Sequence, residues 1–363
     1  MRGLPTAVCR LRGGGEAGTV RCLAPSLPLS LPMTPPPPGH ADRIILVLGA
    51  PRSGTTWLGK IFDSHPDVLY RHEPDIIDRG GMLPKVVAPA DIAAWTAPAR
   101  EYLLRLAALS RLKTAGQLPL FRKTWRGAMA QGVQSGVIHL LRLLEQVPGG
   151  AALAERLAVP DLAARPPGRV VIKSVSGCGC AGLFAAALPR AHIVFLLRPP
   201  FAQIASMLTG SDLRKLDAAQ AVLGLWDWPV ATQYGLTKAG LVGLPLAERL
   251  AWLWVVLNET ALADLAGRPG VRVLDYRALR ARPEQEARAL FGFAGLDWSA
   301  QTAAFLVSST QAGGREGYYA VRRNTAEPDR KWRNVLSAAD CTAIAAIVQQ
   351  STLVRFLDTR AAA

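Results

Sequence analysis

The sequence predicts an α/β protein in which a central parallel sheet is flanked by helices. Short apolar runs rich in β-branched residues recur along the chain and alternate with segments of helical periodicity. The runs carry few polar residues, as expected of parallel strands that are covered on both faces. A turn bounded by two glycines joins the first run to a helix. With 363 residues, half of them apolar, the chain is long enough to bury a large core.

The first 40 residues differ in composition from the rest of the chain. They hold eight of the 27 prolines, four of them in a row, and a run of three glycines. Such a segment buries too little apolar surface to fold, so we expect a disordered Pro/Gly-rich tail over residues 1–40. Met33 is an alternative start of the protein. Residues 41–355 are predicted to form a single domain.

The elements of this domain follow in order along the chain. Strands are expected at 43–48, 68–70, 169–173, 192–197 and 271–275. Helices are expected near 55–64, 98–110, 128–146, 179–188, 200–209, 245–266, 283–293, 299–308 and 337–350. Residues 75–165 contain no clear strand, so this stretch is predicted to be a helical insertion. Ligands of such a sheet bind beyond the carboxyl ends of its strands.

Net charge limits the classes of partner. Lys and Arg number 42 against 27 Asp and Glu, and the resulting charge of +15 indicates an anionic partner. Nucleic acid, a membrane surface and a phosphorylated small molecule are the alternatives. The sequence has no zinc finger, no basic helix with heptads and no aromatic RNA-binding motif, so we favour a small polyanion and expect no nucleic acid. No stretch reaches the ~18 uninterrupted apolar residues of a membrane span, and the oligomeric state is left open.

The cysteines bear on the compartment and on metal binding. Five cysteines without a dense framework are typical of a reducing compartment. Cys178 and Cys180 are close in sequence, but no second pair and no histidine cluster supports a metal site. We therefore expect them to be small residues packed at a helix start. The alanine-, arginine- and proline-rich composition is typical of a GC-rich bacterial genome.

Residues 43–57 predict a binding site for phosphate. An apolar strand leads into a loop bounded by Gly49 and Gly54, and a helical pattern starts at Thr55. The amides of the first helical turn have no intrahelical partner, so this geometry is an anion cradle. The spacing is that of a Walker A motif, but Thr55 stands where a nucleotide triphosphatase needs lysine. Arg52, inside the loop, is the fixed cation instead.

A second element adds a separate phosphate contact. Arg198 follows an apolar strand, and Ser206 lies eight residues on, about two turns into the next helix. An arginine and a hydroxyl in this arrangement can converge on one phosphate. Together with P-R-S-G-T-T-W at 51–57, this element resembles the sulfotransferases that use 3′-phosphoadenosine 5′-phosphosulfate (PAPS). The resemblance implies a P-loop-like sulfotransferase fold, PAPS as co-substrate and no metal.

The resemblance also assigns cofactor contacts by position. It implies that the 5′-phosphosulfate is bound by Arg52, Ser53, Gly54, Thr55 and Thr56. It implies that the 3′-phosphate is bound by Arg198 and Ser206. Trp57 is by resemblance an adenine neighbour, with a core position as the alternative. Tyr276 matches the family's tyrosine after the fifth strand, although Arg277 replaces the acidic residue that follows it. A late basic segment offers Arg322, Arg323 and Lys331, for which a solvated basic loop is the alternative.

Sulfuryl transfer needs a base for the acceptor and cations on the transferring group. In the small-molecule branch of the family the base is the histidine of K-T-H, but here Val175 occupies that position. Lys173 remains and is expected to stabilise the leaving phosphate. The tyrosylprotein branch instead runs from H-P-D-V to a glutamate, and this chain has H-P-D-V at 65–68 followed by Glu73. The resemblance therefore implies Glu73 as general base, assisted by Lys173 and Arg52.

Two expectations about this base concern its surroundings. Partial burial is expected to raise the pKa of Glu73 modestly, which would suit a base. His72 is the substitute base, but in an extended segment its side chain should point away from that of Glu73. A surface salt bridge is the alternative interpretation of Glu73.

Two other functions compete with sulfuryl transfer. A P-loop nucleotide kinase or NTPase would need the missing lysine and a metal-binding aspartate at a strand end. A non-catalytic anion-binding protein on the same fold is the second alternative. For a sulfotransferase the acceptor could be a small molecule, a carbohydrate, a lipid or a peptide, because fold analogy does not choose among them. We expect a cytoplasmic location.

Overall fold

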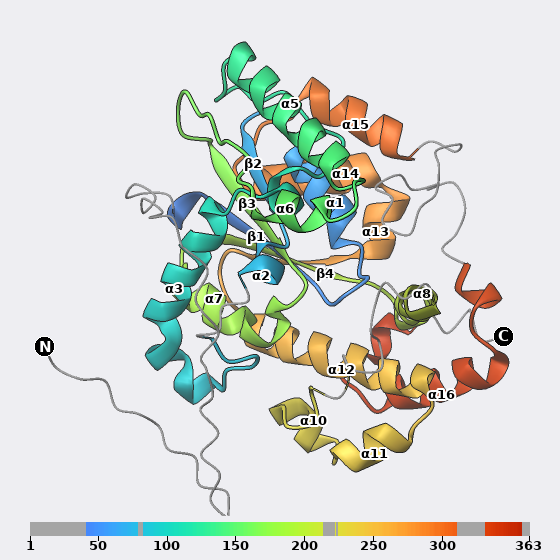
Figure 1. The fold of residues 1–363 in the computed structure, drawn as a ribbon. Coiled ribbons are helices and arrows are strands. Elements are labelled where there is room, and N and C mark those ends of the chain that lie inside the picture. The colour runs from blue at the N-terminus through green and yellow to red at the C-terminus, as the bar shows by residue number, and fades with distance from the viewer. Residues whose placement is uncertain (1–40, 79–82, 213–221, 223, 311–330, 358–363) are drawn as a thin grey trace, which may run out of the picture. The chain divides into compact units, whose positions relative to one another are not determined.

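The computed structural model describes residues 41–78, 83–212, 222, 224–310 and 331–357 (Figure 1). The expected tail over residues 1–40 lies outside this part of the chain. Two of the expected site residues, Arg322 and Arg323, also lie outside the described residues.

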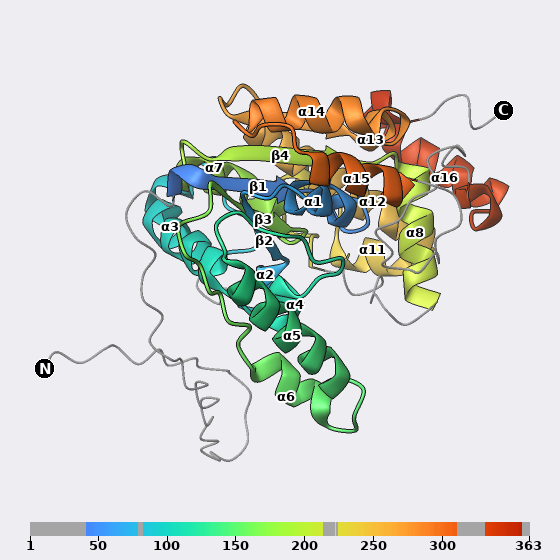
Figure 2. The same cartoon turned by 90° about the horizontal axis from the view of Figure 1, so that it is seen from above.

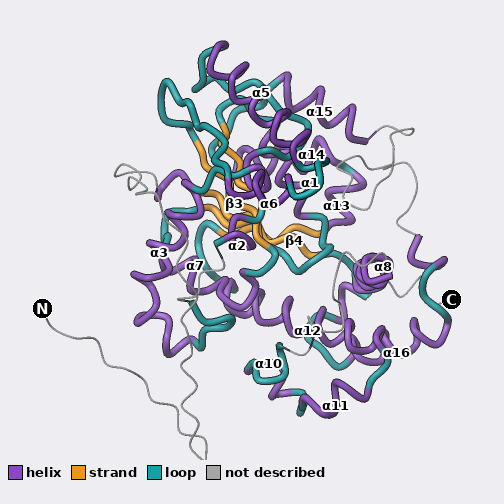
Figure 3. The backbone as a smooth tube through the Cα atoms, in the orientation of Figure 1, coloured by secondary structure: helices purple, strands orange, loops and turns teal. Residues whose placement is uncertain are grey.

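A five-stranded parallel sheet forms the centre of the described chain, which confirms the predicted fold class. Its strands are β1 (Ile44–Leu48), β2 (Val68–His72), β3 (Arg169–Ser174), β4 (His192–Leu197) and β5 (Val271–Asp275). They lie in the order β2-β3-β1-β4-β5. Leu48, at the end of β1, is opposite Ser174 of β3 and Phe195 of β4, so the strands end at a common edge. In Figure 3 the strands occupy the centre and helices surround them.

Helices cover both faces of the sheet. They are α1 (Thr55–Asp63), α2 (Pro74–Ile77), α3 (Ile92–Ala108), α4 (Leu112–Ala115), α5 (Ala128–Leu144), α6 (Gly150–Arg156), α7 (Ala181–Ala187), α8 (Pro200–Asp212), α10 (Pro229–Gln233), α11 (Lys238–Gly243), α12 (Leu246–Leu265), α13 (Tyr276–Ala281), α14 (Pro283–Phe293), α15 (Ala300–Thr310) and α16 (Ala338–Gln349). Two 3-10 helices, η3 (Gly177–Cys180) and η4 (Lys331–Asn334), also matter for the site. None of the helices in the described ranges is long and apolar enough to cross a membrane.

Two apolar cores lie against the two faces of the sheet. Leu46 and Leu48 of β1 belong to the core formed with α3, α7, α8 and α12. Ile45 and Val47 belong to the second core, formed with α1, α13, α14 and α15. All five residues of β1 are therefore buried, which explains the continuous apolar run in the sequence. Figure 1 shows these two groups of helices on either side of the strands.

The segment between β2 and β3 is helical wherever the structure describes regular elements in it, as α2 to α6. A third apolar cluster joins its later helices, with Leu112, Ile138 and Leu141 among its members. Figure 2 shows α5 and α6 beyond the β2 edge of the sheet. The predicted helical character of 75–165 thus agrees with the structure, whereas the limits of the whole domain stay a prediction.

A glycine sets the distance between α1 and β2. A Cβ at Gly59 would lie 2.5 Å from the hydroxyl oxygen of Tyr70, a buried residue of β2. That hydroxyl lies 2.9 Å from Nδ1 of His72, the last residue of β2. The close approach of α1 therefore bears directly on the end of β2, where the candidate site begins.

We predict that Gly59→Ala lowers the free energy of unfolding by about 1–3 kcal/mol, because the added methyl group overpacks this contact. Gly136→Ala is the matched control, since a Cβ at this exposed position of α5 meets nothing within 4 Å. It should raise stability by about 0.5–1 kcal/mol through helix propensity alone. Urea unfolding of both variants measures the difference. Equal effects of the two substitutions would contradict the proposed contact.

Candidate active site

The loop between β1 and α1 has the geometry of an anion cradle. Gly54 precedes α1 with a φ of 101°, a left-handed conformation that favours glycine, and no side chain caps the helix. Arg52 is also left-handed, with a φ of 67°. The amide of Ser53 donates to the carbonyl oxygen of Ala50 at 3.1 Å and closes the turn. The first-turn amides and the positive end of the helix dipole therefore face the loop.

Tyr276 supports this loop from the side. A Cβ at Gly54 would lie 2.5 Å from Cε2 of Tyr276, so only glycine allows the ring to pack there. The guanidinium carbon of Arg198 lies 5.0 Å from the centre of the same ring. Tyr276 is buried, and Asp275, which caps its helix, accepts a hydrogen bond from the amide of Arg277. The substitution of Arg277 for an acidic residue therefore leaves Tyr276 in contact with the loop.

The second sequence element meets the first. Nε of Arg52 donates to Oγ of Ser206 at 3.1 Å. Arg198 donates through its NH1 group to the carbonyl oxygen of Arg52 at 3.1 Å. The structure thus brings together the three side chains that the sequence assigned to two phosphate contacts. Two cationic side chains lie next to each other here, an arrangement that suits an anionic ligand.

Two further residues hold these elements in place, and sequence reasoning missed both. Nε2 of the buried Gln203 donates to the carbonyl oxygen of Pro51 at 2.8 Å. Nε1 of Trp254 donates to the carbonyl oxygen of Arg198 at 2.9 Å. The role of Gln203 could have been predicted from one feature of the sequence, because it is a polar residue in an otherwise apolar turn of the helix after Arg198. Trp254 lies in a long apolar helix and gave none.

Trp57 lies in the core, which was the alternative to its contact with adenine. Its side chain is fully buried, and its Nε1 donates to Oγ of Ser309 at 3.2 Å. The ring also makes an edge contact with Tyr276, with ring centres 6.5 Å apart. An indole with no exposed face cannot stack on an adenine, so the burial argues against the expected contact.

Glu73 and Lys173 form an ion pair at the carboxyl ends of β2 and β3. The ammonium of Lys173 contacts Oε1 of Glu73, and only 1% of the lysine side chain and 21% of the glutamate side chain are exposed. The Glu73 amide donates to the carbonyl oxygen of Lys173 at 2.8 Å. Glu73 therefore lies in a half-buried pair within the fold, and the alternative of a salt bridge at the surface is wrong in its location.

The charges around this pair lower the pKa of Glu73. Burial alone would raise it, but the ammonium of Lys173, with smaller contributions from His72 and Arg52, outweighs burial. The expectation of a raised pKa is therefore wrong, because it counted burial and left out the lysine. Burial also lowers the pKa of Lys173, against the opposing effect of Glu73. The effect of Arg52 on Glu73 shows that the loop and the pair lie within electrostatic reach of each other.

His72 is closer to Glu73 than an extended chain would allow. Its Nε2 lies 4.0 Å from Oε2 of Glu73, whereas the side chains were expected to point apart. The reason is that Glu73 leaves the extended conformation, with a φ of 43° and a ψ of 51°. Burial and the charge of Lys173 lower the pKa of His72 to about 3, so its ring is neutral near pH 7. The pKa of Glu73 is lowered as well, so the pKa does not select between the two groups as general base.

The other residues that the sequence predicts in the site are Lys331 and three residues of the first loop. Lys331 begins η4, whose Trp332 stacks on Phe201 of α8 with ring centres 4.9 Å apart. This contact places the start of η4 beside the helix that carries Ser206. Of the other loop residues, Ser53 and Thr55 are buried and Thr56 is half-buried at the start of α1.

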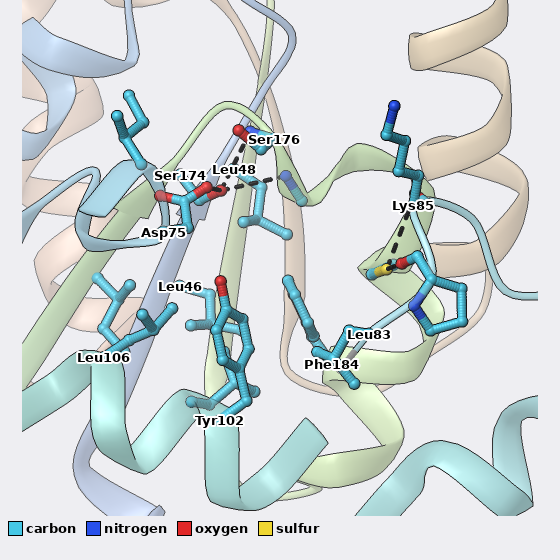
Figure 4. A pocket seen from close by; sticks show the side chains of 16 residues that line it. Leu46, Leu48, Asp75, Leu83, Lys85, Tyr102, Leu106, Ser174, Ser176 and Phe184 are labelled. Atoms are coloured by element: carbon cyan, nitrogen blue, oxygen red, sulfur yellow. Dashed lines mark hydrogen bonds between the residues drawn. The ribbon is translucent and has the colours of Figure 1, made fainter. Parts of the chain in front are cut away.

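A cavity of about 360 Å³ lies on the side of the sheet that α3 covers (Figure 4), and Asp75 and Ser174, which line it, are close in sequence to Glu73 and Lys173. It is lined by Leu46, Leu48, Asp75, Ile76, Leu83, Pro84, Lys85, Tyr102, Leu103, Leu106, Ile172, Ser174, Ser176, Gly177, Cys180 and Phe184. Oγ of Ser174 donates to Oδ2 of Asp75 at 2.7 Å, and burial raises the pKa of Asp75. Burial also raises the pKa of Cys178 and of Cys180 to about 12, so both thiols stay protonated near pH 7. Sequence reasoning did not find this cavity.

The chain is similar to several known proteins. A model described as "Sulfotransferase family" matches residues 44–232, slightly more than half of the chain. Carbohydrate sulfotransferase 6 of Homo sapiens is 25% identical over 334 residues, covering 84% of this chain and 78% of the relative. Carbohydrate sulfotransferase 5 of Homo sapiens is 25% identical over 327 residues, covering 85% and 76%. A solved sulfotransferase domain from the curacin biosynthetic pathway is 16% identical, covers 85% of this chain and 96% of its own, and has a TM-score of 0.43.

The pair of Glu73 and Lys173 generates a prediction about stability. Glu73→Gln should lower the free energy of unfolding by about 1–3 kcal/mol, because a buried ammonium loses its carboxylate. Adding Lys173→Met should recover part of this loss, with a coupling energy of about 1–3 kcal/mol in a double-mutant cycle. The cycle is measured by urea unfolding at pH 7. The exposed pair of Arg190 and Asp42 is the control, for which ~0.2–1 kcal/mol is expected. A coupling no larger than in this control would contradict the buried pairing.

Proposed function

Because this chain belongs to the sulfotransferase family, we propose that it moves a sulfuryl group from PAPS to a hydroxyl or amine acceptor by in-line transfer. The contact between Glu73 and Lys173, within electrostatic reach of the Arg52 loop, carries this proposal. It supplies a carboxylate and a cation next to an anion cradle, which are the groups that such a transfer requires. The assignment to a branch with a glutamate base is part of the same proposal.

The donor is proposed to bind across the two joined sequence elements. The loop from Arg52 to Thr56 takes the 5′-phosphosulfate, since its free helical amides and the arginine are suited to an anion. Arg198, whose guanidinium lies over the ring of Tyr276, and Ser206 take the 3′-phosphate, and Lys331 is proposed as a further contact. The hydrogen bonds from Arg52 to Ser206 and from Arg198 to the loop support a single nucleotide site. Arg322 and Arg323 stay predictions.

Glu73 is proposed to take the proton from the acceptor as its oxygen or nitrogen attacks sulfur. The bond from sulfur to the bridging oxygen breaks, and its electron pair stays on the phosphate, where Lys173 stabilises the negative charge. The lowered pKa keeps Glu73 ionised and ready to accept a proton. A sulfate close to Lys173 would also interact with the ammonium. The attraction between the ammonium and the carboxylate of Glu73 would then be weaker. The burial of Glu73 then favours its protonated form, which strengthens it as a base.

The competing kinase or NTPase function gains no support from the site. Thr55 still occupies the position of the required lysine, and β4 is followed by Arg198 where a metal-binding aspartate would be needed. The names of the two human relatives contain the word carbohydrate, and a carbohydrate acceptor is one of the candidates for this chain. A cytoplasmic location also stays a proposal.

We predict that Glu73→Gln lowers the rate of transfer by roughly 10² or more, because the amide cannot accept the proton. Affinity for 3′-phosphoadenosine 5′-phosphate, the product nucleotide, should change little, since Glu73 is not proposed to bind it. Transfer of ³⁵S from labelled PAPS and calorimetric titration of the nucleotide measure the two effects. Glu101→Gln on the exposed face of α3 is the control and should behave like the unaltered protein. Near-normal turnover of Glu73→Gln would remove Glu73 as the base.

Arg198→Ala should have the reverse effect. Loss of a charged hydrogen-bond donor to the 3′-phosphate is expected to weaken nucleotide binding by about tenfold or more. Arg190→Ala, which removes an exposed arginine paired with Asp42 at the start of the sheet, is the control. Calorimetry without magnesium measures the affinities, and ATP with magnesium tests the kinase alternative in the same format. An unchanged affinity in Arg198→Ala would exclude Arg198 from the nucleotide site.

A further inference from the structure

We propose that the cavity between the sheet, α3 and α7 binds the apolar body of the acceptor, and that Asp75 holds its polar head. The acceptor would then be an amphiphilic alcohol whose head carries a second hydrogen-bond donor next to the reacting hydroxyl, as in a 1,2-diol. This inference rests on the proposed sulfuryl transfer and narrows its acceptor. The volume of about 360 Å³ lies within the range of small-molecule sites, roughly 300–1,000 Å³.

The walls of the cavity exclude a sugar as the bound body. Leu46 and Ile172 come from the sheet, Leu103 and Leu106 from α3, and Phe184 from α7, and all five side chains are buried and apolar. A sugar ring carries several hydroxyl groups, and each would lose its water without a replacement partner against these side chains. A hydrocarbon chain gains from the same contact, because its apolar surface leaves water.

One end of the cavity is polar, and it contains an acceptor atom without a partner. The hydroxyl of Ser174 donates to Oδ2 of Asp75 and accepts from the amides of Ser176 and Gly177, so its bonding capacity is used. Oδ1 of Asp75 is buried and has no hydrogen-bond partner among the described residues. The hydroxyl of Tyr102 donates elsewhere, to the carbonyl oxygen of Asp78 at 3.0 Å. Figure 4 shows Asp75 and Ser174 together above Leu46, Tyr102 and Leu106.

The backbone of two chain segments joins this polar end to the proposed reaction centre. Asp75 follows Glu73 by two residues, and Ser174 directly follows Lys173. The charges of Glu73 and Lys173 both act on Asp75, so the three groups lie within electrostatic reach. In this proposal, a head with two adjacent donors gives one hydrogen bond to Oδ1 of Asp75 while its other hydroxyl reaches Glu73. Buried polar atoms of this kind discriminate strongly against ligands that leave them unpaired.

The test is calorimetric titration of decane-1,2-diol into the protein saturated with 3′-phosphoadenosine 5′-phosphate. We expect the diol to bind with a stoichiometry near one and more tightly than decan-1-ol, while N-acetylglucosamine gives no binding. Ser176→Phe, at an exposed position on the rim, and Leu83→Trp, on a half-buried loop, should each weaken binding of the diol by about tenfold or more. Leu140→Trp on the exposed face of α5 is the matched control and should leave binding unchanged.

Asp75→Asn tests the polar end separately. The amide oxygen can accept from Ser174, which places the amide nitrogen, a donor, where Oδ1 was. The preference for the diol over decan-1-ol should therefore disappear while binding of decan-1-ol persists. A preserved preference would overturn the role of Asp75, and equal diol binding in Ser176→Phe, Leu83→Trp and Leu140→Trp would overturn the cavity as the site.

The outcomes separate this inference from the proposed function. Failure of the unaltered protein to bind the nucleotide counts against the proposed donor, and the diol is then titrated into the nucleotide-free protein. Absence of diol binding in a protein that binds the nucleotide, or tighter binding of N-acetylglucosamine, overturns the apolar acceptor alone.

Discussion

The buried ammonium of Lys173 is the constraint on which the candidate site depends. A lysine that is 1% exposed is tolerated because a carboxylate lies against it, and Glu73 can take this position only if β2 ends at His72 and the chain then turns sharply. The parallel register supplies the rest, since it aligns His72 of β2 with Lys173 of β3. The same register sets Ser174 beside Leu48, the last residue before the anion-binding loop. One pairing thus ties the base, the cation and the loop to a single edge of the sheet.

Cations gather along this edge from parts of the chain that are far apart. Arg52 lies in the first loop, Lys173 at the end of β3 and Arg198 after β4. Each is held by the fold, for example through the contact of Arg198 with Tyr276 and with the carbonyl oxygen of Arg52. Part of the high net positive charge of the chain is therefore concentrated at this edge of the sheet. Such a concentration is suited to a ligand that carries several negative charges.

The fold class and the positions of the five strands along the chain follow from patterns that can be read locally. Five apolar runs predicted the five strands, and the spacing of Gly49 and Gly54 predicted the loop. The features that sequence reasoning missed depend on contacts between segments that are far apart in the sequence. The pKa of Glu73 is lowered by a lysine on another strand, and Trp57 is buried by helices from the second half of the chain. The cavity needs side chains from β1, α3 and α7 at once, so no single stretch of sequence encodes it.

Arg52 and Glu73 are the residues other than glycine with positive φ in the described part of the chain. Such conformations cost about 1–3 kcal/mol each, so the protein holds strain on both sides of its proposed reaction centre. Glycine at either position would relax the backbone but remove a charge that the site requires. Efforts to raise the thermal tolerance of this protein by consensus or glycine substitution should therefore spare these two positions, where added stability and activity are expected to oppose each other.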